Sequence, residues 1–190
     1  MFFNFFYISL HRITQKTKIV MDKIYLAAYK KFSDYELLKV VCDKITERLN
    51  RDETTFYVTT GESGDNTCMK YARDNGFKIE DWFPDEKFAD YKRECMANGH
   101  WHEFYNVLKA EKNKYISMAD HVVFVWDYDE DNNGVGCGMK MASKNNKTLS
   151  VVIPEKKEVH VFRPSEPQKK FVYSIANGTM THVRTENNER

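Results

Sequence analysis

Short apolar runs alternate with segments of helical periodicity along the first 154 residues of the chain. The runs have the length and the β-rich composition of buried strands. Five strands are therefore predicted, over residues 23–29, 54–60, 77–83, 120–129 and 148–154. The fourth run is the strongest, because residues 122–126 are continuously apolar, as in a strand that is covered on both faces.

Helices are predicted between these runs. Ser33 or Asp34 can cap the first helix. The residues on its apolar face recur at helical spacing: Leu37, Leu38, Val41, Ile45 and Leu49. Further helices are expected over 65–75, as one or two helices within 86–118, and over 139–145. Gly76 is expected to end the second helix.

Strands that alternate with helices predict an α/β fold. We expect a Rossmann-like three-layer sandwich with a mostly parallel five-stranded sheet, formed by residues 21–154. Residues 155–190 change character and are predicted to form a short β-rich C-terminal appendage. Its three short strands are expected over 157–164, 169–175 and 179–185. Asn177-Gly178 is a turn signal between the last two of these strands.

Residues 1–20 are interpreted as an N-terminal extension outside the native core. The run MFFNFFYISL is apolar, but a membrane span needs about 20 such residues. A secretory signal carries its positive charge before the apolar run, whereas here the basic residues follow it. The alternative is a strand or helix that docks on the core. We expect no membrane association and a cytoplasmic location.

The composition is that of an ordinary soluble globular protein. The chain has 190 residues, of which 42% are hydrophobic and 30% charged, and its formal net charge is +1. This balance gives no support to bulk nucleic-acid binding. The four cysteines show no CxxC pair and no metal-type spacing with histidine, so we expect reduced thiols, no metal and no cofactor.

Two glycine-containing loops are predicted after the second and fourth strands. The first holds Gly61, Glu62, Ser63, Gly64 and Asp65, and the second holds Gly134, Gly136 and Cys137. A loop from strand end to helix start presents free N–H groups and the positive end of a helix dipole, and glycine lets an anion approach closely. We therefore expect both loops to line one cleft for a phosphate-bearing ligand, with Lys30 at its rim. The plainer alternative is that any α/β fold needs glycine turns.

Carboxylates near the same edge are candidates for chemistry. Asp65, Asp127 and Glu130 are suited to contact ribose hydroxyls or to act in N-glycosidic chemistry, because an oxocarbenium-like centre needs nearby negative charge. The alternative for residues 127–131 is a solvated acidic loop. Cys137 is assigned to ligand binding, since no histidine partner for a nucleophile can be placed beside it.

Four motifs in order resemble the SLOG superfamily of Rossmann-like nucleotide-binding domains, shared by DNA-processing and cytokinin-activating proteins, and within it the YspA-like branch of bacteria and phages. AYKKFSDYELL matches a GSRxF-type motif, with Lys30 at the arginine position. GESGDNTCMKYA matches a Gly-Ala-Asp loop and the helix that follows it. Lys112-Asn113 stands for an Arg-Asn pair, and GVGC stands for a Ser-x-Gly-Thr loop.

The resemblance implies a pocket for a nucleotide or nucleotide-derived ligand, such as NAD, ADP-ribose or a nucleoside phosphate, at the strand ends. We expect a sensor or sequestering protein, in the host cytoplasm if the chain is phage-encoded. One alternative is an enzyme that hydrolyses or transfers at an N-glycosidic bond of such a ligand. Another is a phage module that acts on a host protein. The PGGxGTxxE signature of the cytokinin-activating enzymes is absent. A homo-oligomer remains an open alternative.

Overall fold

The computed structural model describes residues 22–60, 63–127 and 133–187. The predictions for residues 1–20 and for Gly61, Glu62 and Glu130 lie outside these ranges. The described strands are β1 (Lys23–Ala28), β2 (Thr55–Val58), β3 (Lys78–Asp81), β4 (His121–Val125), β5 (Thr148–Ile153), β6 (Glu158–Phe162), β7 (Lys169–Ala176) and β8 (Thr179–Asn187). The described helices are α1 (Tyr35–Thr46), α2 (Ser63–Asp74), α3 (Asp85–Ala97), α4 (Trp101–Met118) and α5 (Asn133–Lys144).

The first five strands are parallel, as predicted. They lie in the order β3-β2-β1-β4-β5, with β1 at the centre. In this register Ile24 of β1 lies beside Phe56 of β2. On the other side of β1, Leu26 lies beside Val123 of β4. Parallel neighbours need a crossover between them, so every connection among these strands contains a helix.

The sheet does not end at β5, and here the prediction of a mostly parallel five-stranded sheet was wrong. Strands β6, β7 and β8 continue the same sheet in antiparallel pairing, so that the described part of the chain forms one mixed sheet of eight strands. A tight turn in which the Lys157 amide donates to the Pro154 carbonyl lets β6 pair directly with β5. The predicted turn between β7 and β8 is confirmed, because Asn177 and Gly178 both have positive φ, at 51° and 71°.

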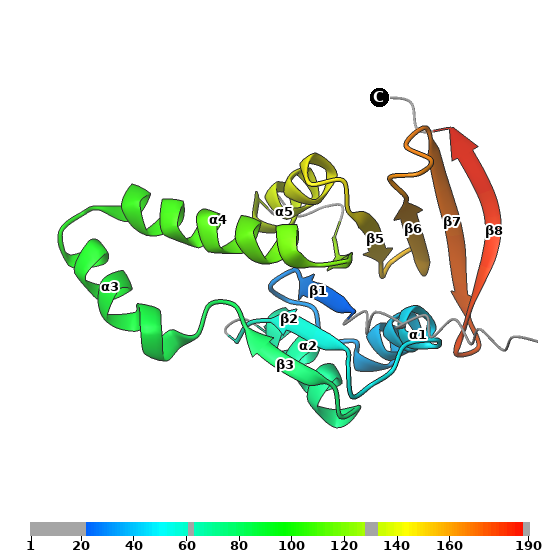
Figure 1. The fold of residues 1–190 in the computed structure, drawn as a ribbon, viewed down its shortest axis with the longest axis horizontal. Helices are drawn as coiled ribbons and strands as arrows, with labels where there is room; N and C mark the ends of the chain where they lie inside the picture. Colours follow the sequence, from blue (N-terminus) through cyan, green and yellow to red (C-terminus); the bar gives the residue numbers. More distant parts are fainter. Residues whose placement is uncertain (1–21, 61–62, 128–132, 188–190) are drawn as a thin grey trace, which may run out of the picture.

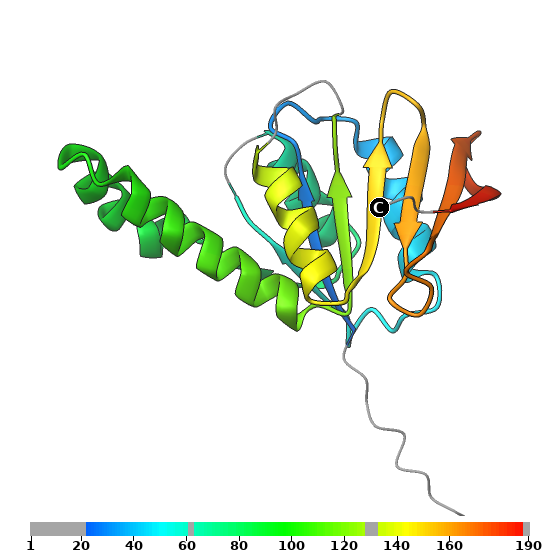
Figure 2. The ribbon, with the colours of Figure 1, turned by 90° about the horizontal axis from the view of Figure 1, so that it is seen from above.

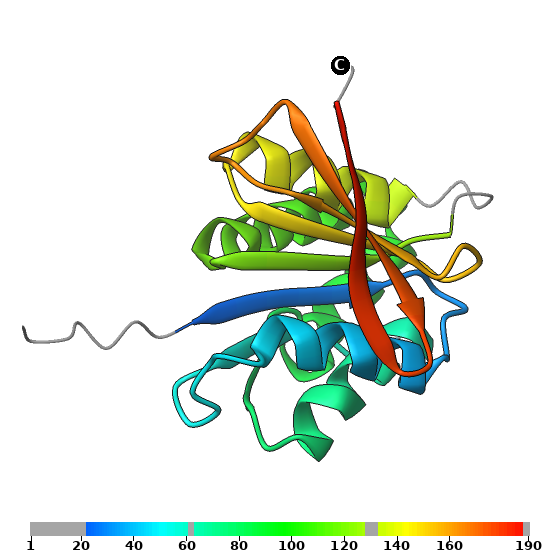
Figure 3. The same cartoon turned by 90° about the vertical axis from the view of Figure 1, so that its right-hand side faces the viewer.

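Helices cover both faces of the parallel strands, as predicted (Figure 1). Side chains of β1 alternate between two cores. Ile24, Leu26 and Ala28 point toward α1 and α2. Tyr25 and Ala27 point toward α4 and α5. Figure 3 shows the two layers on opposite sides of the sheet, with α1 and α2 below it and α4 and α5 above.

Local signals set the ends of two helices as expected. Asp34 caps α1, where its Oδ1 accepts a hydrogen bond from the Leu37 amide at 3.0 Å. Gly76 has a φ of 70° just beyond the end of α2, which favours glycine at that position. The predicted stretch 86–118 forms two helices, α3 and α4.

The α3–α4 hairpin projects from the body of the molecule (Figures 1 and 2). Phe88, Cys95 and Phe104 of this hairpin are buried. The ring of Phe83, which precedes α3, contacts those of Phe88 and Phe104. Only the C-terminal part of α4 reaches the sheet, where Ile116 joins the core beneath it. Among the described residues, no helix combines the length and the apolar character that crossing a membrane would require.

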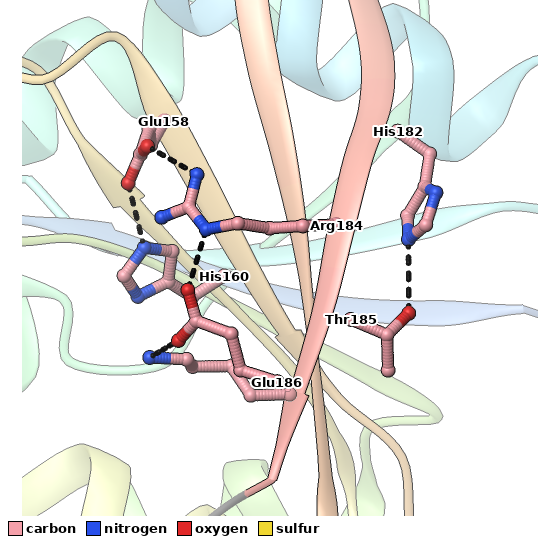
Figure 4. Close-up of polar contacts among 7 residues, drawn as sticks. Glu158, His160, His182, Arg184, Thr185 and Glu186 are labelled. Atoms are coloured by element: carbon pink, nitrogen blue, oxygen red, sulfur yellow. Dashed lines mark hydrogen bonds and ion pairs between the residues drawn. The ribbon is translucent and has the colours of Figure 1, made fainter.

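A charged network lies on the antiparallel strands, on the face opposite α1 (Figure 4). Glu158 accepts hydrogen bonds from His160 and Arg184, both at 3.0 Å. Glu186 pairs with Lys170 and accepts a hydrogen bond from Arg184, and these two cations lower the pKa of its carboxyl to about 2. Charged residues occupy this face because the helix layer ends at α5 and leaves it facing solvent.

His121 makes the stability of the sheet depend on pH. Its ring contacts the Ser150 hydroxyl at 2.9 Å, and burial, followed by the charge of Arg163, lowers its pKa from 6.5 to about 4. The folded state holds this ring neutral, so its contribution is complete above pH 6.5 and is lost as the pH falls toward 4. We expect the free energy of unfolding to drop by up to about 3 kcal/mol across this window.

Chemical denaturation over a pH series measures this drop. His121→Gln keeps a hydrogen-bonding group beside Ser150 and should flatten the pH dependence, whereas His182→Gln at an exposed position should retain it. An unchanged slope in His121→Gln would contradict the assignment.

Candidate functional site

The chain connections change direction at the carboxyl edge of the parallel strands, between β1 and β4. The chain leaves β1 toward β2 and leaves β4 toward β5, so consecutive connections run in opposite directions from this point. In open α/β sheets, ligands bind at such a switch point, outside the carboxyl ends of the strands. Helices α2 and α5 begin at this edge because each follows a parallel strand.

Gly64 holds the start of α2 against the loop after β1. The Gly64 amide donates to the Lys30 carbonyl at 3.2 Å. A Cβ atom at Gly64 would lie 2.1 Å from the Tyr29 carbonyl oxygen and 3.1 Å from Ala28 Cβ. Packing against backbone therefore explains this glycine, and the space beside it is filled by protein. Gly64 positions the site rather than admitting a ligand itself.

Helix α5 contains the residues that were predicted as the second glycine loop. It begins at Asn133, so Gly134, Gly136 and Cys137 lie in its first two turns, and the loop prediction for them was wrong. Gly138 is required by packing, since a Cβ there would lie 2.3 Å from the Phe124 ring. Packing does not explain the glycine at position 136, because a Cβ atom there would meet nothing within 4 Å. Glycine weakens a helix, so an unpacked glycine here calls for another explanation.

Asp65 lies in the first turn of α2 and is half-buried. Its negative charge adds to burial in raising the pKa of Tyr25. It also acts on Lys112, whose pKa is lowered by burial and raised in part by Asp65 and Cys137. The structure therefore brings Asp65 of α2 into electrostatic range of residues on β1 and α4. Negative charge in the first turn of a helix is stabilised by the helix dipole.

Lys112 joins α4 to the start of α5. Its Nζ donates to the Gly134 carbonyl at 3.3 Å and lies 5.7 Å from the centre of the Trp82 ring. Beside it, a crevice of about 150 Å³ separates the two helices. The crevice is lined by Tyr105, Leu108, Lys109, Lys112, Gly134 and Cys137. Cys137 is half-buried, while Cys42, Cys68 and Cys95 are buried, and all four thiols are free.

Two buried polar atoms lie in the core beneath α4. Within the described part of the chain, the Tyr25 hydroxyl and Trp82 Nε1 have no hydrogen-bond partner. Their rings are 5.9 Å apart. Leaving buried donors unpaired costs free energy, so such atoms mark a place for water or a polar ligand group.

The remaining predicted residues are distributed as follows. Lys30 is exposed in the loop after β1, and Asp127 is half-buried two residues beyond β4. Ser63 is the first residue of α2. Sequence reasoning missed Tyr105, Leu108 and Trp82, and it noticed Lys112 only through the family resemblance. The spacing of Tyr105, Leu108 and Lys112 along α4 is the signal that was available.

Comparison with known proteins does not assign the chain to a family. No protein-family model matches the chain, and no curated protein matches it significantly. Membership of the SLOG superfamily therefore stays a proposal. Among the residues that the structure describes, no group of three or more His, Cys, Asp or Glu side chains is arranged to hold a metal ion.

Substitution by alanine is expected to have opposite effects at Gly64, where a Cβ would clash, and at Gly136, where it would not. Gly64→Ala should destabilise the fold by about 1–3 kcal/mol, because the new methyl group meets a backbone carbonyl. Gly136→Ala should stabilise it by about 0.5–1 kcal/mol, because alanine favours the helix and the space is open. Urea denaturation of both variants measures the difference. A destabilised Gly136→Ala would show that this position is packed.

Proposed function

We propose that the protein binds a phosphate-bearing, nucleotide-derived small molecule at the carboxyl edge between β1 and β4, as a sensor or sequestering protein. NAD, ADP-ribose and nucleoside phosphates are the candidate ligands. The observation that carries the proposal is Gly136. It is a helical glycine with open space beside it, and it is the fourth residue of a helix that begins at the switch point of a parallel sheet.

The geometry favours a division of roles within this site. The amides at the start of α5 and the half-buried Lys112 suit a phosphate, because both supply positive potential. Asp65 at the start of α2 suits ribose hydroxyls, because a carboxylate accepts the hydrogen bonds that hydroxyl groups donate. Lys30 can add a further positive charge at the exposed rim.

The resemblance to the SLOG superfamily supports the same ligand class. Its glycine, lysine and aspartate motifs fall on the first turns of α2 and α5, on the loop after β1 and on the part of α4 that faces α5. Lysine stands at both arginine positions of the family pattern. A lysine ammonium group contacts phosphate as a point charge and cannot make the bidentate contact of a guanidinium group.

A thermal-shift experiment with ADP-ribose, NAD and AMP tests the proposal. A ligand at a hundredfold excess over its dissociation constant stabilises the fold by about 2.7 kcal/mol. For a domain of this size that raises Tm by roughly 5–10 °C. Gly136→Val should abolish the shift while leaving the unliganded Tm nearly unchanged, since its side chain enters open space. Lys144→Val, which places the same side chain at the other end of α5, should keep the shift.

Failure of all three compounds to shift Tm would contradict the proposed ligand class. An equal shift in Gly136→Val and in the parent would move the site away from the start of α5.

An enzyme that cleaves the N-glycosidic bond of such a ligand is the second candidate. The placement of Asp65 favours it, because this carboxylate lies within electrostatic range of both Lys112 and Tyr25. Negative charge near an oxocarbenium-like centre stabilises it. Asp127 is the described alternative for the same role.

Asp65→Asn distinguishes the two candidates. If the protein only binds, the variant should show a smaller Tm shift with NAD, and neither protein should release nicotinamide. If the protein is an enzyme that uses Asp65, the parent should release nicotinamide, and the variant should bind NAD but lose turnover by about a hundredfold or more. Chromatographic product analysis after overnight incubation measures this. Equal turnover in parent and variant would exclude Asp65 as the catalytic carboxylate.

A further inference from the structure

A groove of about 500 Å³ runs along the flank of α5, where the helix layer ends before the sheet does. Its lining residues come from α5, from the end of β4, from β5 and β6, and from the loops that follow α5 and β6. None of the residues assigned to the candidate site belongs to this set. The volume lies in the range of about 300–1,000 Å³ that is typical of pockets for whole small molecules.

The floor of the groove is mostly apolar. Leu149 and Val151 of β5 and Phe162 of β6 point to this face of the sheet. Trp126 contributes an aromatic ring from the end of β4, and Met139 contributes the flank of α5. The loop between β6 and β7 closes the far side with two prolines. Such a surface favours the apolar body of a ligand.

The charge in the groove is positive. Lys140 and Lys147 lie along its α5 side, and none of the described residues that line it is Asp or Glu. The guanidinium of Arg163 does not add to this charge. It lies over the Phe171 ring at 4.5 Å and within 4.0 Å of Glu166. The two lysines therefore set the sign of charge that the groove accepts.

His160 supplies one fixed polar group in the floor. Its side chain is only 10% exposed, and its Nε2 donates to Glu158 at 3.0 Å. Arg184 holds Glu158 from the neighbouring side, so the ring is fixed in orientation (Figure 4). A buried imidazole is costly in an apolar floor, and a strand residue such as valine would pack there without that cost.

We propose that this groove binds a small amphipathic carboxylate, with its apolar body on the sheet floor and its anionic head at Lys140 and Lys147. The site is separate from the nucleotide site at the carboxyl edge, and neither depends on the other. The volume of the groove fits a small molecule, its apolar floor fits an apolar ligand body, and its two lysines fit a negatively charged head group.

Fluorescence quenching of the full chain by bromoundecanoate tests this assignment. Bromine quenches an indole only on contact, and Trp126 is the tryptophan that lines the groove, while Trp82 and Trp101 lie elsewhere. We expect saturable quenching in the parent and its loss in Trp126→Phe. Calorimetry should show that Trp126→Phe binds unbrominated undecanoate with an affinity lowered by less than about tenfold, because phenylalanine keeps an aromatic ring in the groove. Loss of quenching would then report the position of the bromine and not loss of the site.

Charge reversal separates specific binding from detergent-like adsorption. Lys140→Glu with Lys147→Glu should weaken undecanoate binding by about tenfold or more, because it replaces attraction of the head by repulsion. The matched pair Lys92→Glu with Lys114→Glu, on the α3–α4 hairpin, should bind as the parent does. Undecanol, which lacks the charge, should bind at least about fivefold more weakly than undecanoate.

Three results would overturn the proposal. These are unsaturable quenching, quenching that persists in Trp126→Phe, and equal loss of affinity in both charge-reversal pairs. Light scattering over a concentration series tests the alternative that a second copy of the chain occupies the groove. A dimer that Phe162→Lys dissociates would assign the groove to self-association instead.

Discussion

Parallel pairing of β1 with β2 on one side and with β4 on the other is the constraint on which the rest of the structure depends. The residues of β1 from Ile24 to Ala28 are all buried, so this strand needs cover on both faces. Parallel pairing also forces each connection to cross the sheet through a helix. The two requirements meet in one solution, with α1 and α2 on one face and α4 and α5 on the other.

The same pairing creates the candidate site. Because the chain departs from β1 and from β4 in opposite directions, the crossover helices that follow these two strands lie on opposite faces of the sheet. Gly64 then brings α2 close enough for its amide to bind the backbone after β1, and Gly138 brings α5 close enough to cover Phe124. These two glycines shape the edge through protein packing. At Gly136, by contrast, a Cβ atom would meet nothing within 4 Å.

The antiparallel extension answers a different need. Pairing with β6 satisfies the backbone groups on the outer side of β5, and the extension moves the edge of the sheet to β8. The extension also reaches beyond the helix layer that ends at α5. One of its faces packs against the α1 side of the core through Val159, Val161 and Ile175. The other carries the groove beside α5 and the network of Glu158, Arg184 and Glu186.

Local pattern was enough for most of the secondary structure. The runs that contain Ile24, Phe56 and Val123 became strands, because continuous apolar β-rich segments of this length have few other stable states. Asp34 and Gly76 marked helix ends because each acts on backbone within a few residues of itself. The candidate site was predictable only in part, as glycines and carboxylates that follow β2 and β4.

The sequence by itself therefore determined where most of the strands and helices lie, and that strand and helix alternate in a parallel α/β order. The tertiary structure decided that residues 134–138 are helical despite three glycines, because Gly138 allows α5 to pack on Phe124 and packing outweighs propensity. It decided that Lys112 reaches Gly134 and that β6 pairs with β5. Each of these depends on contacts between segments whose proximity no local pattern encodes.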